Sequence, residues 1–149
     1  VIWLTLVASG VLSMLQYLPP QGPSYVWFST EEIRLAESIR SQTAPRAVFV
    51  TGERPNNPIA DLAGRPVVMS YPGWLWSYGI NYQQREADIA RIYQGGPNTL
   101  HLLRRYHAQY VVIGPDEIAN QHANSDYFNA RFPVLLRTQN YTIYRVPAA

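Results

Sequence analysis

Residues 71–93 gather most of the side chains in this sequence that could bind a ligand. The candidate substrate-binding residues are three aromatic and three charged residues: Trp74, Trp76, Tyr78, Arg85, Glu86 and Asp88. Aromatic rings offer flat apolar faces that pack on sugar rings or lipid chains, and a few nearby polar groups orient the ligand. Tryptophan and tyrosine are also favoured where a membrane meets water. This composition predicts a surface that faces a sugar or a lipid.

The alternative interpretation of the same stretch is structural. A loop of this composition also folds over a core, with Arg85 in an ion pair with Glu86 or Asp88. Arg104 and Arg105 leave a similar choice, because a guanidinium group binds lipid phosphate through two hydrogen bonds but also lies solvated on many helices. The sequence leaves both choices open.

Patterns of known catalytic sites are missing from the sequence. There is no phosphate-binding GxxxxGK[ST], no GxGxxG after a strand and no zinc-binding HExxH. Ser70 lies in VMSYPG, which lacks the GxSxG pattern of a nucleophile elbow. The chain has no cysteine, and its three histidines have no carboxylate spacing typical of a metal site. We therefore expect no catalytic residue, metal site or cofactor in this chain, which alone is not a complete enzyme.

The charge of the chain comes from twelve arginines, without a lysine, against ten acidic residues, for a net charge of +2. The arginines are spread along the sequence, whereas a nucleic-acid-binding protein more often carries a clustered basic stripe. We therefore expect no nucleic-acid partner. The length of 149 residues fits one domain of ordinary size.

The first eighteen residues carry no charge, and a run rich in proline and glycine follows them. A helix that spans a bilayer needs about 20 apolar residues. We expect residues 1–18 to be either the end of a transmembrane helix or an element buried in the domain, and the lack of a basic start argues against a signal peptide. Residues 19–28 then form a linker, and residues 29–149 form a single soluble domain.

Helical and strand patterns alternate along the rest of the chain. Helices are expected at residues 31–43, 59–63, 83–93, 99–107 and 116–132, and strands at 47–51, 66–71, 110–113, 134–137 and 141–146. Ser29 and Thr30 are suited to cap the first helix, and Gly64 is suited to end the second. The alternation predicts a three-layer α/β fold with a mainly parallel sheet, helices on both faces and an antiparallel hairpin at the C-terminal edge.

Several short motifs occur in a recognisable order. Gly73-Trp74 is followed by Arg85 to Asp88, by Ile92-Tyr93 and by LLRRYHAQYVVIG at 102–114. In this order, residues 28–146 resemble the C-terminal region of bacterial multi-spanning membrane proteins of the GT-C glycosyltransferase type, including the YYY-type membrane proteins. The stretch 74–79, WLWSYG, is also similar to the Trp-Trp-Asp-Tyr-Gly motif of oligosaccharyltransferase catalytic subunits, with serine in place of the aspartate.

The resemblance implies an accessory domain on the periplasmic or extracytoplasmic face of a membrane glycosyltransferase. Its partners would be its own transmembrane domain, the membrane and a polyprenyl-phosphate sugar, and the aromatic stretch would assist binding of the lipid-linked donor or the acceptor. The family's catalytic acid lies in an early loop outside this chain, so whether the parent protein is an enzyme stays open. The alternative is a non-catalytic interaction or scaffold domain of a bacterial envelope membrane protein.

Overall fold

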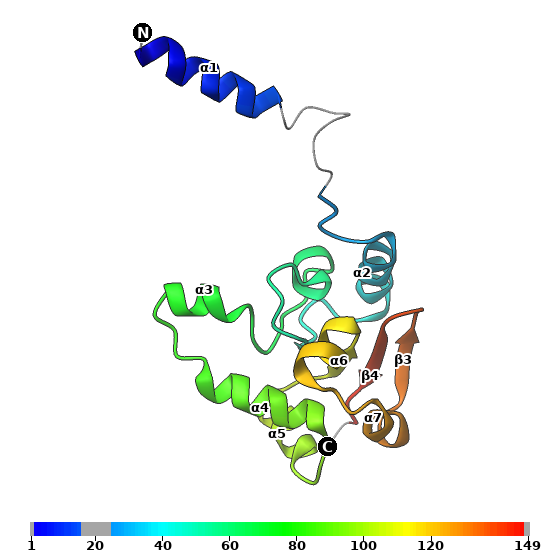
Figure 1. Ribbon diagram of the computed structural model, residues 1–149. Helices are drawn as coiled ribbons and strands as arrows, with labels where there is room; N and C mark the ends of the chain where they lie inside the picture. Colours follow the sequence, from blue (N-terminus) through cyan, green and yellow to red (C-terminus); the bar gives the residue numbers. More distant parts are fainter. Residues whose placement is uncertain (1, 16–24, 148–149) are drawn as a thin grey trace.

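The computed structural model describes residues 2–15 and 25–147, and Figure 1 shows how their helices and strands are arranged. A four-stranded sheet forms the centre of the fold, with its strands in the order β1-β2-β4-β3. The strands are β1 (Phe49–Val50), β2 (Tyr110–Ile113), β3 (Val134–Arg137) and β4 (Thr142–Arg145). β1 runs parallel to β2, whereas β4 is antiparallel to both β2 and β3. The domain is therefore a mixed α/β fold.

The expected mainly parallel sheet is wrong, whereas the antiparallel hairpin at the C-terminal edge is confirmed. The expected strand at 66–71 contributes a single parallel bridge, between Val67 and Phe49. Pro66 has no N–H to donate, and its carbonyl oxygen accepts a hydrogen bond from the Phe49 nitrogen at 2.9 Å. On the edge of β1 that faces away from β2, the parallel pairing is therefore limited to this one bridge.

Helices cover both faces of the sheet, as the alternating pattern predicts. Because side chains alternate along a strand, Val111 and Ile113 of β2 face one core cluster and Val112 faces the other. The first cluster is covered by α4 (Gln83–Gln94), α5 (Thr99–Arg105) and α7 (Ser125–Arg131), and the second by α2 (Thr30–Gln42) and the π-helix η1 (Pro58–Leu62). The three-layer arrangement is confirmed.

Two helix ends form where the local sequence predicts them. The Ser29 hydroxyl accepts a hydrogen bond from the Glu32 nitrogen at 3.2 Å, and the Glu32 carboxylate accepts one from the Ser29 nitrogen at 2.7 Å. This reciprocal pair satisfies two backbone donors at the start of α2. Gly64 follows η1 with a φ of +64°, a conformation that glycine adopts without a steric cost.

Two helical regions differ from the expectation. The single helix expected at 116–132 is two helices, α6 (Pro115–Gln121) and α7, separated at His122, which adopts a left-handed φ of 52°. The short helix α3 (Pro72–Ser77) forms where the sequence indicates only a loop. Pro72 lies in its first turn, where a missing N–H costs nothing.

The N-terminal region is described only in part. Residues 2–15 form the helix α1 (Ile2–Leu15), which Figure 1 shows apart from the sheet and its covering helices. The predicted boundary of the apolar segment at residue 18 and most of the predicted linker, 19–28, lie outside the described residues. Among the described helices, none combines the length and the apolar character that a membrane crossing requires.

Candidate functional site

Residues 71–82, called here the aromatic arm, follow the bridge at Val67 and contain α3. None of the residues of α3 is buried, and Figure 1 shows this helix standing out from the rest of the fold. Trp76 is 75% exposed and Tyr78 is 82% exposed, which is unusual for side chains that gain so much from burial. Leu75 and Tyr82 pack against the core cluster beneath α4 and α5, and so anchor the arm. The arm therefore presents aromatic rings to the outside from a fixed base.

The end of α3 is set by a glycine. Gly79 has a φ of +68°, and its nitrogen donates to the Trp76 carbonyl oxygen at 2.9 Å. The Ile80 nitrogen donates to the Leu75 carbonyl oxygen, also at 2.9 Å. These two bonds form a Schellman motif, which ends the helix and turns the chain back toward the core. Residues 80–83 are thereby brought beside Trp76.

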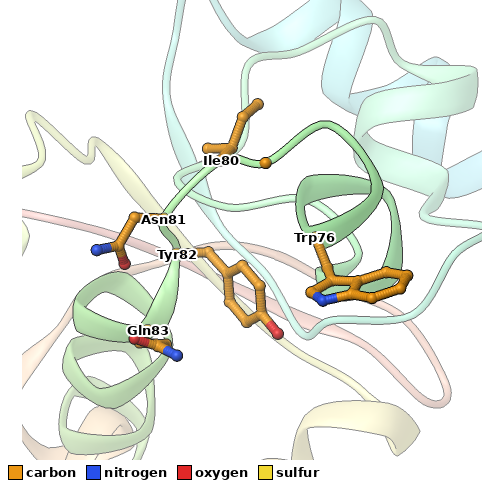
Figure 2. Close-up of a pocket in the computed structure, with 6 residues that line it drawn as sticks. Trp76, Ile80, Asn81, Tyr82 and Gln83 are labelled. Carbon is orange, nitrogen blue, oxygen red and sulfur yellow. The ribbon is translucent and has the colours of Figure 1, made fainter.

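This turn creates a cleft between α3 and the start of α4, shown in Figure 2. Its volume is about 310 Å³, and it is open to solvent. Its lining residues are Trp76, Gly79, Ile80, Asn81, Tyr82 and Gln83. The rings of Trp76 and Tyr82 lie near each other in Figure 2, with the Gln83 amide on the first turn of α4. The cleft combines aromatic rings with side-chain amides and contains no charged residue.

Trp74 belongs to a different part of the arm. Its ring meets the Tyr71 ring edge to face, with 5.7 Å between the ring centroids. Gly73 lies so close to the Tyr71 ring that a Cβ at this position would be 2.5 Å from Cε1. Glycine at 73 therefore allows this aromatic pair to form, and 48% of Trp74 stays exposed beside it.

The three charged candidate residues on α4 lie in three different environments. Arg85 is exposed and donates to the Val68 carbonyl oxygen at 3.4 Å, while Glu86 is half-buried. Asp88 is 1% exposed and forms ion pairs with Arg91 at 3.2 Å and with Arg105 at 3.3 Å. The structural alternative, in which Arg85 pairs with Glu86 or Asp88, does not occur among the described ion pairs. Asp88 instead joins α4 to α5.

A second polar group, which no sequence motif indicates, lies at the carboxyl ends of β1 and β2. Glu117 is buried, and its carboxylate accepts hydrogen bonds from the Gly52 nitrogen at 2.7 Å and the Gly114 nitrogen at 2.9 Å. Burial raises the pKa of Glu117, against the opposing effect of the Gly52 hydrogen bond. Glu117 thus holds the two loops together, and no cluster of possible metal ligands occurs among the described residues.

Glu53 lies beside this group and is expected to destabilise the fold at neutral pH. Burial, and then the charge of Glu86, raise the pKa of Glu53. A raised pKa means that the folded state disfavours the charged form of Glu53. The contribution of Glu53 to the free energy of unfolding is therefore highest below its pKa in the unfolded chain, and it is lost as the pH rises through its pKa in the folded chain. Glu53→Gln should therefore raise the free energy of unfolding at pH 7 by about 0.5 kcal/mol, a figure reduced for solvent screening, and should have no effect below about pH 4.

Urea unfolding of the Glu53→Gln protein at both pH values measures this effect. Glu37→Gln, which changes an exposed residue of α2, is the control and should leave stability unchanged at both. A gain of equal size at both pH values would mean that the charge of Glu53 is not responsible.

The structure brings together only some of the candidate residues. Trp76 lines the cleft, whereas Trp74, Tyr78 and the charged candidates do not belong to its lining. Asn81 and Gln83 do line it, and sequence reasoning missed them, because single amides near a helix start look like ordinary surface residues. The signal that could have found them is Gly79, since a glycine after a short helix predicts a reversal of the chain.

Comparison with known proteins shows a likeness of fold. The chain is similar to the crystal structure of the C-terminal globular domain of an oligosaccharyltransferase from Archaeoglobus fulgidus, with a TM-score of 0.51 and 16% sequence identity. The match covers 80% of this chain and 99% of that one. No protein-family model and no curated protein matches the chain. The expected resemblance to an oligosaccharyltransferase is therefore supported only as a likeness of fold to its C-terminal globular domain.

Proposed function

We propose that this chain is an extracytoplasmic accessory domain of a membrane glycosyltransferase of the GT-C type. The aromatic arm assists the binding of a lipid-linked sugar donor or of the acceptor. The observation that carries the proposal is the exposed aromatic arm on a fold similar to the globular domain of an oligosaccharyltransferase. Catalysis itself belongs to another part of the parent protein, because the chain offers no recognisable catalytic group.

The exposure of the arm supports a contact with something outside this domain. Burying a large aromatic side chain is favourable by about 1.5–3 kcal/mol. Leaving these rings in water therefore has a free-energy cost, which contact with a binding partner would remove. Leu75 in α3 and Tyr82 at the end of the arm both pack against the core, so the rings of the arm are held in place before a ligand arrives. A preorganised surface loses less entropy on binding.

Transfer by the full-length protein in membranes tests this proposal. Trp74→Ala and Arg85→Ala should each lower transfer by about fivefold, because one exposed aromatic or charged contact contributes about 1 kcal/mol. The melting temperature of the 149-residue chain should change by less than about 2 °C, since both side chains are exposed.

Ile118→Ala is the matched control, because Ile118 is exposed to a similar degree, 53%, but lies on α6. It should leave transfer unchanged. Equal losses of transfer and of folding in the Trp74 and Arg85 variants would contradict a binding role. Unchanged transfer in both variants would favour the alternative of a non-catalytic interaction domain.

A further inference from the structure

We propose that the cleft between α3 and α4 binds a neutral sugar unit. This inference deepens the proposed function and rests on it for the identity of the larger ligand, the glycan part of a lipid-linked donor or of the acceptor. The site itself consists of the cleft residues Trp76, Asn81, Tyr82 and Gln83. Of the candidates from the sequence, only Trp76 belongs to this site, whereas Trp74, Tyr78 and the three charged residues on α4 lie outside its lining.

The two aromatic rings supply the apolar contact that a sugar needs. A pyranose ring has faces of C–H groups, which pack on the electron-rich face of an aromatic ring. Tyr82 is partly buried and packs against the core, so it is a fixed wall, while Trp76 is 75% exposed and closes the other side. Figure 2 shows both rings beside the same opening.

The amides supply the polar contact. A side-chain amide has both donors and an acceptor, which suits the hydroxyl groups of a sugar, since each hydroxyl also donates and accepts. Neither the Asn81 nor the Gln83 amide makes a side-chain hydrogen bond within the described chain, so their capacity remains available. Both residues are exposed at the opening.

The absence of charge among the lining residues of this cleft selects against anionic ligands. A phosphate or a uronic acid gains most from arginine or lysine, which form charge-assisted hydrogen bonds. The cleft volume of about 310 Å³ lies at the lower end of the range for small-molecule sites, which fits one or two sugar units rather than a long chain. The geometry therefore favours a neutral monosaccharide or disaccharide.

Titration of the full 149-residue chain in detergent micelles tests the site. The probes are cellobiose, maltose and N,N′-diacetylchitobiose, and the readout is the NMR shift of the Trp76 indole N–H. At least one disaccharide should shift this signal in a saturable way. Trp76→Ala should weaken binding, followed through the backbone amide of Gln83, by about tenfold, because it removes one of two aromatic walls.

Three further variants separate the sugar site from general effects. Trp76→Phe keeps a ring and should retain more affinity than Trp76→Ala, and Asn81→Ala should weaken binding about fivefold through loss of a hydrogen bond. Trp27→Ala is the control, because Trp27 is 66% exposed but precedes α2 and should leave binding unchanged. Equal loss in Trp27→Ala, or no disaccharide shift at all, would overturn the proposal.

The outcomes also distinguish this site from the proposed function. Disaccharide binding that depends on Trp76, together with full transfer by the Trp74 and Arg85 variants, keeps the sugar site and removes the proposed function. Reduced transfer by those variants without any disaccharide binding keeps the proposed function and removes the sugar site. A shift caused by farnesyl phosphate but by no disaccharide assigns the cleft to the lipid and overturns the sugar site.

Discussion

Replacing Asp88 by asparagine should lower the free energy of unfolding by about 2 kcal/mol. One carboxylate oxygen of Asp88 accepts hydrogen bonds from Gln84 at 3.0 Å and Arg91 at 3.2 Å, and the other accepts from the Tyr106 hydroxyl at 2.7 Å and Arg105 at 3.3 Å. Asparagine keeps one acceptor and turns an NH₂ group toward donors. Both arginines are more than half exposed and can return to water, so the loss stays below the full range for a buried pair.

Urea unfolding followed by circular dichroism measures the loss. The control is Asp126→Asn, the same substitution at an exposed position in the first turn of α7, which should cost less than about 0.5 kcal/mol. If Asp88→Asn instead leaves stability unchanged but lowers transfer by the full-length protein, Asp88 acts on a ligand. The buried position with four donors favours the stabilising role, because no acceptor oxygen of Asp88 is left without a partner.

The sequence predicts best what neighbouring residues decide. Ser29 and Glu32 satisfy each other at the start of α2, and Gly64 takes its left-handed φ, as their types indicate. The strand β2 has the bounds that the run of apolar residues predicts. The two helix ends depend on contacts within a few residues and the bounds of β2 follow a continuous apolar run, and one sequence contains both kinds of information.

The order of the strands depends on distant residues, and the sequence alone predicts it poorly. β2 pairs with β4, more than 25 residues later, through contacts such as Val112 with Ile143. A strand-like run therefore does not reveal its partner, as the single bridge at Val67 demonstrates. The break at His122 is only partly indicated, because Asn120, Asn124 and Ser125 weaken a continuous helix, whereas a left-handed histidine is uncommon.

The candidate site likewise has a part that the sequence predicts and a part that it does not. The aromatic composition predicts the region, since Trp74, Trp76 and Tyr78 all lie on an exposed arm. It does not predict which ring faces which neighbour, because that depends on the direction of each side chain from α3. The turn at Gly79 reverses the chain after α3 and brings the amides of Asn81 and Gln83 to Trp76.

Gly95→Ala should lower the free energy of unfolding by about 3 kcal/mol, the largest effect that we expect from a single substitution. Gly95 ends α4 with a φ of +75° and a ψ of 153°, a conformation essentially restricted to glycine, which costs an alanine at least about 1 kcal/mol. A Cβ there would also be 2.5 Å from Cγ of Tyr127 in α7. The Tyr127 hydroxyl donates to the Gly96 carbonyl oxygen at 2.8 Å, so the ring cannot easily move away, and overpacking adds about 2 kcal/mol.

Gly64→Ala separates the two causes. Gly64 has a similar φ of +64°, but a Cβ there would meet no atom within 4 Å, so its variant measures the cost of a positive φ without crowding, about 1 kcal/mol. Removing the ring by Tyr127→Ala should reduce the additional cost of Gly95→Ala to the same value, which a double-mutant cycle by urea unfolding would detect. Equal losses at Gly95 and Gly64 would mean that Tyr127 can shift. In that case α7 does not fix the end of α4, the helix whose first turn borders the cleft beside Trp76.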